Sequence, residues 1–246
     1  MSCDPTTLDG LLDGRVRLSQ PTDGYRVAMD AVMLAAAVPA RARDHVVDLG
    51  AGAGAASLCL AARLADCRIT AIEVDPFAAR LARDNAALND AAGRITVIEA
   101  AIETVTADQL CTVDHVMANP PYLPSSRAAP SARGDRATVE QDDIDLAVWI
   151  RVALTLVRAK GSVSFIQRAD RLDDLIAGLR QSAGEIIVYP LWPKAGRAAK
   201  RVLVRARRNV SSPLSLKPGM VLHRDDGAYT AAAESVLRHA KTISME

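Results

Sequence analysis

Asn119, Pro120, Pro121 and Tyr122 form the stretch whose residue types are best suited to chemistry. They follow Val113 to Ala118, an apolar run typical of a short buried strand. Each proline fixes its own φ and donates no backbone hydrogen bond, so the stiff turn offers two acceptors, the Asn119 side-chain oxygen and the Pro120 carbonyl. These acceptors and the flat ring of Tyr122 suit a planar NH2 group on a conjugated system. The alternative is a proline-rich turn that merely ends a strand.

A glycine-rich turn follows an earlier apolar strand, His45 to Leu49, and precedes a helix, Ala55 to Leu64. Strand, glycine-rich turn and helix is the arrangement of nucleotide-binding sites, in which glycines let the backbone approach the ligand closely. We therefore expect this turn to bind a cofactor. Its candidate cofactor-binding residues are Asp48, Gly50, Ala51, Gly52 and Gly54.

The next strand, Arg68 to Ile72, is followed by Glu73 and Val74, which we expect to contact the cofactor. An acid at this position accepts hydrogen bonds from ribose hydroxyls, a device that nicotinamide enzymes share. Asp48 discriminates between the cofactors, because a carboxylate beside the helix N-terminus repels a pyrophosphate. S-adenosylmethionine has no phosphate but carries a sulfonium and an ammonium group, so it fits better. The alternative for Asp48 is a turn-stabilising residue.

Four polar residues fall at the carboxyl ends of predicted strands: Asp48, Glu73, Glu99 and Asn119. Open parallel sheets bind ligands at this edge, so the four placements together predict one site. Ala101 comes shortly after the third predicted strand, Ile95 to Glu99, and is expected to contribute only shape to the cofactor pocket.

Charge is distributed unevenly along the chain, although the net charge is +1. Residues 1–150 hold 13 Lys and Arg against 21 Asp and Glu, whereas residues 151–246 hold 17 against 8. Such a chain is able to present a basic surface to a polyanion, unless the two sets of charges interleave and cancel. The candidate RNA-binding residues lie in a long loop, Leu123 to Asp143, and in a later basic stretch. They are Arg127, Arg133, Arg136, Lys194, Arg197, Lys200 and Arg201. For the later stretch, the alternative to RNA binding is a hairpin whose charges are only solvated.

From about Gln20 onward, the chain resembles the bacterial tRNA adenine-N6 methyltransferases that modify valine tRNA beside the anticodon, which are class I S-adenosylmethionine-dependent enzymes. The matching parts are Thr22 to Gly24, Asp48 to Gly52, Glu73, Asn119 to Tyr122, and Asp226 to Thr230. The resemblance implies methylation of the exocyclic N6 amine of an adenine in tRNA. It also implies that Asn119 and the Pro120 carbonyl accept the two N–H groups of this amine, and that Tyr122 stacks on the flipped base.

Two sister activities share the Asn-Pro-Pro-Tyr motif, namely methylation of a release-factor glutamine at N5 and of a ribosomal RNA guanine at N2. The glutamine enzymes have a separate N-terminal helical domain, whereas the first predicted sheet strand here already begins at His45. The guanine enzymes are usually longer because a domain is duplicated. From other classes, a nicotinamide oxidoreductase and a catalytically silent RNA-binding module remain alternatives.

The alternation of strands and helices predicts an α/β fold, and the resemblance implies its details. These are a doubly wound, mostly parallel seven-stranded sheet with helices on both faces, a Rossmann-like methyltransferase fold, and an antiparallel last strand. The later strands are expected over Ile95 to Glu99, Gly161 to Gln167, Glu185 to Pro190 and Val202 to Val204. The later helices are expected over Phe77 to Asn89, Ile144 to Ala159, Ala169 to Ser182 and Ala231 to Ala240.

Residues 1–40 are expected to form an N-terminal hairpin and helix that act as a flap. Pro21 and Gly24 predict a turn or hairpin over Gln20 to Met29, and a helix is predicted over Asp30 to Val38. In this interpretation, Tyr25 and Arg26 face the cofactor; the alternative is a helix that packs over one end of the sheet. Residues 41–246 are expected to form the S-adenosylmethionine-dependent methyltransferase domain with basic C-terminal strands.

The four cysteines and four histidines lack the spacing of metal ligands, so we expect reduced thiols and no metal. The N-terminus has no signal-peptide pattern and no apolar stretch is long enough to span a membrane. We therefore expect a cytoplasmic protein with tRNA as its partner and no membrane contact. The sequence does not decide between a monomer and a homodimer.

Overall fold

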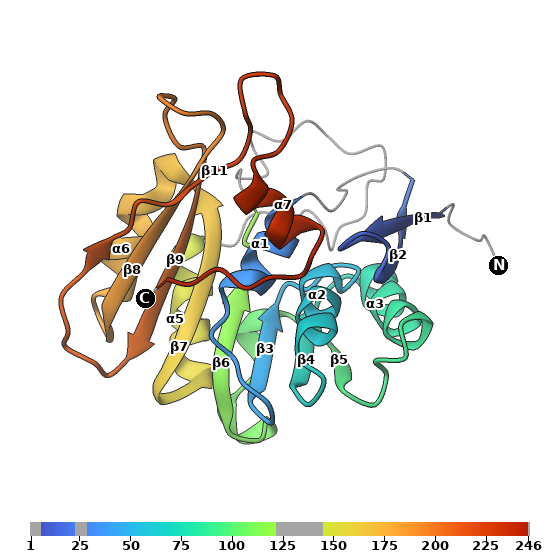
Figure 1. The fold of residues 1–246 in the computed structure, drawn as a ribbon. Helices are drawn as coiled ribbons and strands as arrows, with labels where there is room; N and C mark the ends of the chain where they lie inside the picture. Colours follow the sequence, from blue (N-terminus) through green and yellow to red (C-terminus); the bar gives the residue numbers. More distant parts are fainter. Residues whose placement is uncertain (1–5, 23–28, 122–144, 246) are drawn as a thin grey trace.

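The computed structural model describes residues 6–22, 29–121 and 145–245, which form a sheet covered by helices on both faces (Figure 1). The strands of this sheet are β3 (His45–Leu49), β4 (Arg68–Glu73), β5 (Ile95–Glu99), β6 (Val113–Ala118), β7 (Val157–Arg168), β8 (Ala183–Trp192), β9 (Arg201–Arg208), β10 (Ser215–Leu216) and β11 (Met220–Val221). Their order is β10-β8-β9-β7-β6-β3-β4-β5, and β11 also pairs with β8.

The predicted fold class is confirmed by the seven long strands, β3 to β9. Neighbours from β5 across to β7 are parallel, and β9, the last of the seven along the chain, is antiparallel to both β7 and β8. The sheet has nine strands because the chain after β9 returns along the free edge of β8, where β10 and β11 pair parallel to it. Two strands of two residues each are too short to give a periodic signal in the sequence.

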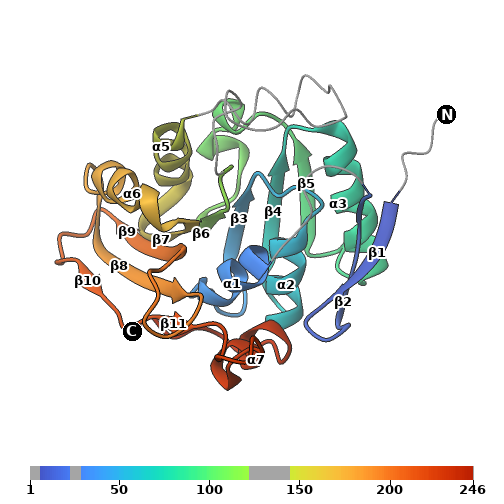
Figure 2. The same cartoon turned by 90° about the horizontal axis from the view of Figure 1, so that it is seen from above.

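The predicted helices all occur, with ends that differ by a few residues. They are α1 (Met29–Ala37), α2 (Ala55–Arg63), α3 (Pro76–Leu88), α5 (Leu146–Leu156), α6 (Leu172–Leu179) and α7 (Ala231–Leu237). Seen from above, α5 and α6 cover one face of the sheet, while α1, α2 and α7 lie on the other (Figure 2). α3 begins at Pro76 because Asp75 caps it, its carboxylate accepting hydrogen bonds from the backbone N–H groups of Phe77 and Ala78.

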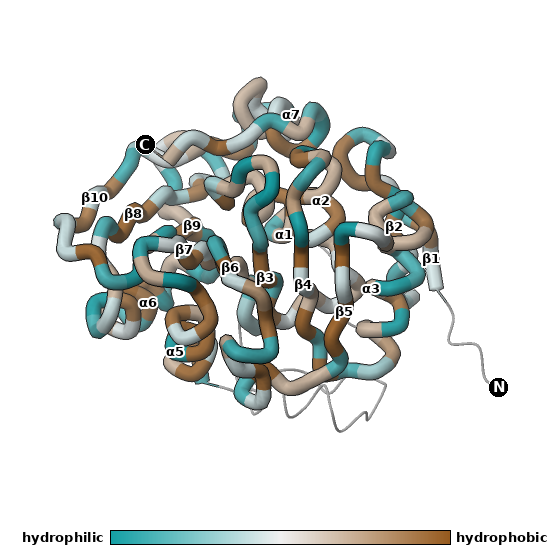
Figure 3. The backbone as a smooth tube through the Cα atoms, turned by 90° about the horizontal axis from the view of Figure 1, so that it is seen from below, coloured by the Kyte–Doolittle hydropathy of each residue, from teal (hydrophilic) through white to brown (hydrophobic). Residues whose placement is uncertain are grey.

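The hydrophobic core consists of two clusters, one on each face of the sheet. Hydrophobic stretches run within β3, β4 and the edge strand β5 (Figure 3). Trp149 and Phe165 fill the cluster under α5 and α6, and Met33 and Leu34 fill the one under α1 and α2. Each of these side chains is fully buried and contributes roughly 1.5–3 kcal/mol by leaving water. Across the described ranges, no helix is long and apolar enough to cross a membrane.

The N-terminal hairpin lies earlier in the chain than the sequence suggested. It consists of β1 (Thr6–Leu11) and β2 (Val16–Pro21), joined by a turn with positive φ at Leu12, Asp13 and Gly14, whereas residues 23–28 fall outside the described residues. The alternating burial along β2 is the strand signal that our sequence analysis overlooked. Helix α1 is buried along most of its length and packs against α2 and α7. The boundary at residue 40 and the flap role stay predictions.

Asn85 of α3 and Asn89, the C-cap of this helix, hold β2 against α3. Asn85 Oδ1 accepts a hydrogen bond from the backbone N–H of Ser19 at 2.8 Å, and its Nδ2 donates to the Ser19 carbonyl at 2.8 Å and to the Ala53 carbonyl at 2.9 Å. Asn89 forms the equivalent pair with the backbone of Arg17 at 2.8 and 2.7 Å. Asn85 and Asn89 are four residues apart and so lie on one side of the helix, whereas Arg17 and Ser19 are two residues apart and so lie on one face of β2. Each side-chain amide therefore reaches one residue of β2.

We expect Asn85→Ala to lower the free energy of unfolding by about 2–3 kcal/mol, because two backbone groups of Ser19 and the carbonyl of Ala53 lose their buried partner. Urea denaturation followed by circular dichroism measures this change. Asn89→Ala is the matched control and should cost less, since its bonds to Arg17 are exposed to water. Equal costs for the two variants would contradict this account of Asn85.

Candidate functional site

Parallel pairing brings the carboxyl ends of β5, β4, β3 and β6 to one edge of the sheet. Glu73 pairs with Glu99 in the register of β4 and β5, and Asp48 pairs with Met117 in that of β3 and β6, two residues before Asn119. The four polar residues that the sequence assigned to strand ends therefore lie along this edge. The side chain of Glu99 is about half exposed and forms an ion pair with Arg83 of α3 at 3.5 Å.

The glycine-rich turn between β3 and α2 has a backbone that needs glycine. Gly50, Gly52 and Gly54 have φ values of 65°, 56° and 86°, a region that residues with a Cβ rarely adopt. The backbone N–H of Ala51 donates to the carbonyl of Ile72 at 3.0 Å, which fixes the turn to the end of β4. The turn therefore lies across the carboxyl ends of both strands.

Glu73 connects β4 to this turn. Its side chain is buried, and its carboxylate accepts hydrogen bonds from the backbone N–H groups of Gly52 at 2.7 Å and Asp75 at 2.9 Å. Burial raises the pKa of Glu73 above its usual value, and the two hydrogen bonds counteract part of this rise. The carboxylate is thus directed at the glycine-rich turn, where a cofactor was predicted.

Asp48 is buried between β3 and α2. Its carboxylate accepts a hydrogen bond from the Ser57 hydroxyl at 2.7 Å. Burial raises the pKa of Asp48 to about 7, the hydrogen bond to Ser57 lowers it in part, and the nearby charge of Glu73 raises it further. Two carboxyl groups therefore share a buried region beside the turn, and a positive ligand there would favour their charged forms.

The other two predicted cofactor contacts lie at the same edge. Val74 follows Glu73 directly and is half-buried. Ala101 comes two residues after the end of β5 and caps the short 3-10 helix of Ile102–Thr104, whose Thr104 donates to its carbonyl. The backbone N–H of Ala100 donates to the carbonyl of Glu73 at 2.9 Å, so these two segments are held together.

Asn119, Pro120 and Pro121 leave the end of β6, beside the carboxyl end of β7. The Pro120 carbonyl accepts a hydrogen bond from Gln167 Nε2 at 3.4 Å, and Gln167 Oε1 in turn accepts from the backbone N–H of Arg168 at 2.8 Å. Gln167 is fully buried. Our sequence analysis missed it, although a glutamine directly after the apolar run Val163 to Ile166 was an available signal.

Several predicted site residues lie outside the described residues and have no structural account. They are Tyr25, Arg26, Tyr122, Arg127, Arg133 and Arg136. The structure therefore describes the acceptor turn as far as Pro121 and the predicted RNA-binding residues from Lys194 onward.

The remaining predicted RNA-binding residues lie on the connection from β8 to β9, beyond the carboxyl end of β8 (Figure 1). Arg197 and Lys200 are exposed. Lys194 Nζ donates to the carbonyl of Asp225 at 3.0 Å, and Arg201 forms an ion pair at 3.1 Å with Asp30, a buried residue of α1. Two of the four basic side chains thus have contacts within the protein, and two are free of hydrogen bonds to other described residues.

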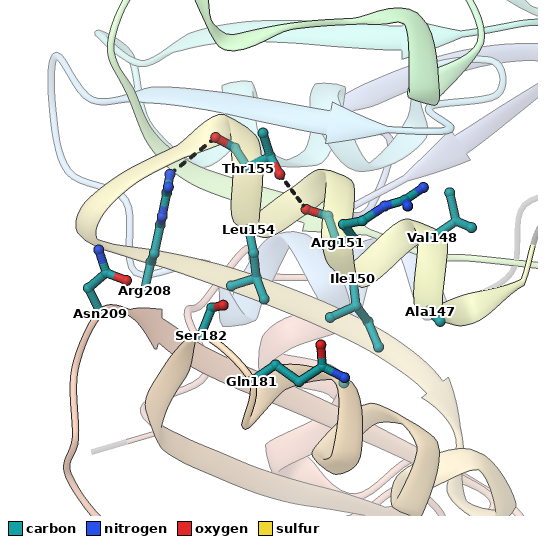
Figure 4. Close-up of a pocket in the computed structure, with 11 residues that line it drawn as sticks. Ala147, Val148, Ile150, Arg151, Leu154, Thr155, Gln181, Ser182, Arg208 and Asn209 are labelled. Atoms are coloured by element: carbon teal, nitrogen blue, oxygen red, sulfur yellow. Dashed lines mark hydrogen bonds between the residues drawn. The ribbon is translucent and has the colours of Figure 1, made fainter.

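A groove of about 350 Å³ opens between α5 and α6, and Gln181 and Ser182 line it near the amino end of β8 (Figure 4). Arg208, which also lines it, donates hydrogen bonds to the carbonyls of Thr155 and Val157 and so closes the end of α5. None of the described residues predicted for the functional site lines this groove. Its side chains serve the packing of the two helices.

Comparison with known sequences relates the chain to enzymes that modify tRNA. Residues 26–133 match the family model of the methyltransferase small domain. A tRNA1(Val) (adenine(37)-N6)-methyltransferase from Aeromonas hydrophila is 32% identical over 209 residues, which cover 83% of this chain and 85% of the relative. An enzyme of the same name from Porphyromonas gingivalis is 33% identical over 174 residues, 65% of this chain and 66% of the relative.

Solved structures share the fold. A predicted O-methyltransferase from Agrobacterium tumefaciens has a TM-score of 0.72 at 26% identity, covering 88% of this chain and 98% of that chain. A tRNA m1G37 methyltransferase from M. jannaschii has a TM-score of 0.58 at 19% identity, covering 84% of this chain and 57% of that chain. The second likeness shows the fold alone, and both agree with the predicted fold class.

The raised pKa of Asp48 makes stability depend on pH. Between the unfolded value near 3.8 and the folded value of about 7, the folded protein binds the extra proton, so the contribution of Asp48 to stability falls as pH rises through this range. The measured quantity is the free energy of unfolding of the ligand-free wild type minus that of Asp48→Asn. We expect this difference to fall between pH 5 and pH 7, by at most about 1.4 kcal/mol per pH unit. Above pH 7 it should level off. Urea denaturation at several pH values measures this difference, and parallel curves for the two proteins would contradict it.

Proposed function

The chain belongs to the tRNA1(Val) (adenine(37)-N6)-methyltransferase family, and from this premise we propose that it transfers a methyl group from S-adenosylmethionine to the exocyclic N6 amine of an adenine in tRNA. One observation carries the proposal. The Asn119–Pro121 turn leaves β6, and the glycine-rich turn leaves the adjacent parallel strand β3 at the same edge of the sheet. A methyl donor bound at one turn and an acceptor amine bound at the other are thus neighbours.

The chemistry of the glycine-rich turn fits S-adenosylmethionine. When bound, this cofactor supplies an electrophilic methyl group on a sulfonium. The buried carboxyl groups of Asp48 and Glu73 favour a cation and disfavour a phosphate. A Cβ built on Gly52 meets no atom within 4 Å, so ligand atoms have room to approach the backbone there. The proposed cofactor contacts among the described residues are Asp48, Gly50, Ala51, Gly52, Gly54, Glu73, Val74, Ala101 and Asn119.

Glu73 is suited to bind ribose hydroxyls without giving up its bonds to the turn. Its two carboxylate oxygens accept from the backbone N–H groups of Gly52 and Asp75. An ionised carboxylate has about four lone-pair sites, so two remain for hydroxyl donors. A ribose bound in this way lies over the turn, with the carboxylate fixed in advance by the protein.

The acceptor turn is suited to an amine. The exocyclic nitrogen of adenine is a poor nucleophile because its lone pair is delocalised into the ring. Asn119 Oδ1 and the Pro120 carbonyl accept its two N–H bonds, which favours a pyramidal nitrogen with its lone pair directed at the methyl group. Much of the acceleration comes from this alignment, for which effective molarities reach roughly 10⁵ M. A general base is not needed, since the methylated nitrogen is a strong acid and loses its proton to water.

The pair of acceptors favours nitrogen over oxygen as the methyl acceptor. A hydroxyl has one hydrogen, so it can donate to only one of the two acceptors that the turn offers to a substrate. Glutamine amides and the guanine N2 group also carry two hydrogens, so N5 methylation of a protein glutamine and N2 methylation of a ribosomal guanine are the competing reactions. Analysis of the product separates the three.

We further propose that tRNA lies across the rim formed by the β8–β9 connection, with Arg197 and Lys200 contacting its phosphates. Both side chains are exposed at the edge of the sheet that carries the acceptor turn. Arg201 supports them indirectly, because its ion pair with buried Asp30 anchors the end of the connection to α1. Phosphate contacts of this kind weaken as salt rises.

The test of this function is to incubate the purified protein with isotope-labelled S-adenosylmethionine, bulk tRNA and bulk protein, and to identify the product by nucleoside and peptide mass spectrometry. We expect N6-methyladenosine in tRNA. We expect Asn119→Ala to reduce transfer by about 10²–10³-fold, as for other hydrogen bonds made in a transition state, while S-adenosylhomocysteine still binds through the remaining cofactor contacts. Methylglutamine, methylguanosine or an O-methylated product would overturn the assignment, as would full activity of Asn119→Ala.

We also expect Gln167 to position the Pro120 carbonyl. Gln167→Glu replaces the N–H donor with a carboxyl that donates only when protonated, so its activity relative to wild type should fall as pH rises. The loss of about one hydrogen bond predicts roughly a tenfold lower rate at high pH. Single-turnover rates at saturating S-adenosylmethionine and RNA measure it.

A merely structural role for Gln167 predicts a different result. In that case Gln167→Glu would lose activity in proportion to its loss of thermal stability, with the pH profile of the wild type. Gln167→Met, which cannot donate at any pH, is the matched control, and its relative rate should be low and independent of pH.

A further inference from the structure

The turn between β11 and α7 carries two stacked aromatic side chains. His223 and Tyr229 face each other in an isolated antiparallel bridge, their ring centroids are 4.6 Å apart, and their ring planes differ by 23°. Tyr229 packs against the core cluster on the α1 and α7 face, while His223 is half-buried. Both rings are half-buried, so part of the stack is accessible at the surface.

Two backbone hydrogen bonds hold this turn. The backbone N–H of Arg224 donates to the Ala228 carbonyl at 2.8 Å, and that of Gly227 donates to the Arg224 carbonyl at 3.0 Å. His223 Nδ1 lies 3.1 Å from the Gly227 carbonyl, which only accepts hydrogen bonds, so Nδ1 carries the hydrogen. This contact fixes the ring orientation, and Nε2 has no hydrogen bond to the described residues.

The stack is attached to the basic β8–β9 connection. Beyond the end of β8, the backbone N–H of His223 donates to the carbonyl of Pro193 at 3.1 Å. Lys194 Nζ donates to the carbonyl of Asp225 at 3.0 Å. The turn and the connection thus lie side by side at the rim (Figure 1). Arg197 and Lys200, which are exposed, belong to this connection.

We propose that the His223–Tyr229 stack is a platform for an unpaired base of the RNA substrate, with the adjacent phosphates on Arg197 and Lys200. The proposal rests on the proposed function for the class of ligand, an RNA with a single-stranded loop. A flat ring fixed beside cationic side chains is the combination that binds single-stranded nucleic acid, because every base has a face that stacks and every nucleotide has a phosphate. The simpler alternative is that the two rings only brace the turn.

The test compares His223→Ala with His223→Phe in the full chain. Fluorescence anisotropy measures the dissociation constant for two probes, an anticodon stem-loop of valine tRNA and a fully paired RNA duplex of equal length. For the stem-loop, we expect His223→Ala to weaken binding about tenfold or more, in the range of one lost base stack, and His223→Phe to bind like the wild type. For the duplex, we expect all three proteins to bind equally.

A phosphate contact gives a different pattern, which serves as the matched control. Lys200→Ala should weaken binding to both probes and reduce the slope of log K against log salt by about 1, whereas His223→Ala should leave the slope unchanged. Unchanged stem-loop affinity of His223→Ala would overturn the platform, and so would an equal loss for the duplex. If His223→Phe bound as weakly as His223→Ala, an aromatic face at residue 223 would not be sufficient for binding, and the platform would be overturned.

Methyl transfer to tRNA is measured in parallel with binding, so that the two proposals fail separately. Transfer that yields N6-methyladenosine, together with wild-type stem-loop affinity in His223→Ala, would overturn the platform and leave the function intact. Stem-loop binding that depends on the ring at residue 223, without any methyl transfer, would overturn the function and leave the platform intact. Melting temperatures of the variants show whether each remains folded.

Discussion

The hydrogen bond from Gly52 to the Glu73 carboxylate is the contact on which the candidate site depends. It holds the glycine-rich turn at the carboxyl edge of β4, where the backbone of Gly52 has a positive φ that favours glycine. The arrangement buries two carboxyl groups, and burial raises the pKa of both Asp48 and Glu73. A cationic ligand at this edge offsets that cost. The hydrogen bond that holds the turn therefore also keeps a buried carboxylate at the site, and this carboxylate favours a positively charged ligand.

The acceptor side depends on rigidity of a different origin. Asn119 and Pro120 follow a central strand with neighbours on both sides, and the prolines remove most of the freedom of the turn. Gln167 adds a side-chain contact from β7, the next strand. The prolines and Gln167 keep the two acceptors in a fixed direction before the substrate binds. Alignment accelerates a reaction when the groups that align the substrate are already in place.

The order of the strands separates three tasks along one edge. β4 and β3 carry the proposed cofactor contacts, β6 carries the acceptor turn, and β9 and β8, beyond β7, carry the basic connection. The strands that carry Asp48 and Glu73 and the strands that flank the basic connection therefore lie on opposite sides of β6.

The sequence by itself determined the α/β class, the glycine-rich turn and the edge at which Asp48, Glu73 and Asn119 meet. These features follow from local patterns: apolar runs, glycines that need positive φ, and prolines that end a strand. The tertiary structure decided the contacts that join distant segments, such as Gln167 to Pro120, Asn85 to Ser19, and Arg201 to Asp30. Each of these pairs is separated by 47 or more residues, and nothing in the pattern around one partner specifies the other. Such pairs form because folding leaves a buried polar group that needs a partner, and only the packed chain determines which group is near enough.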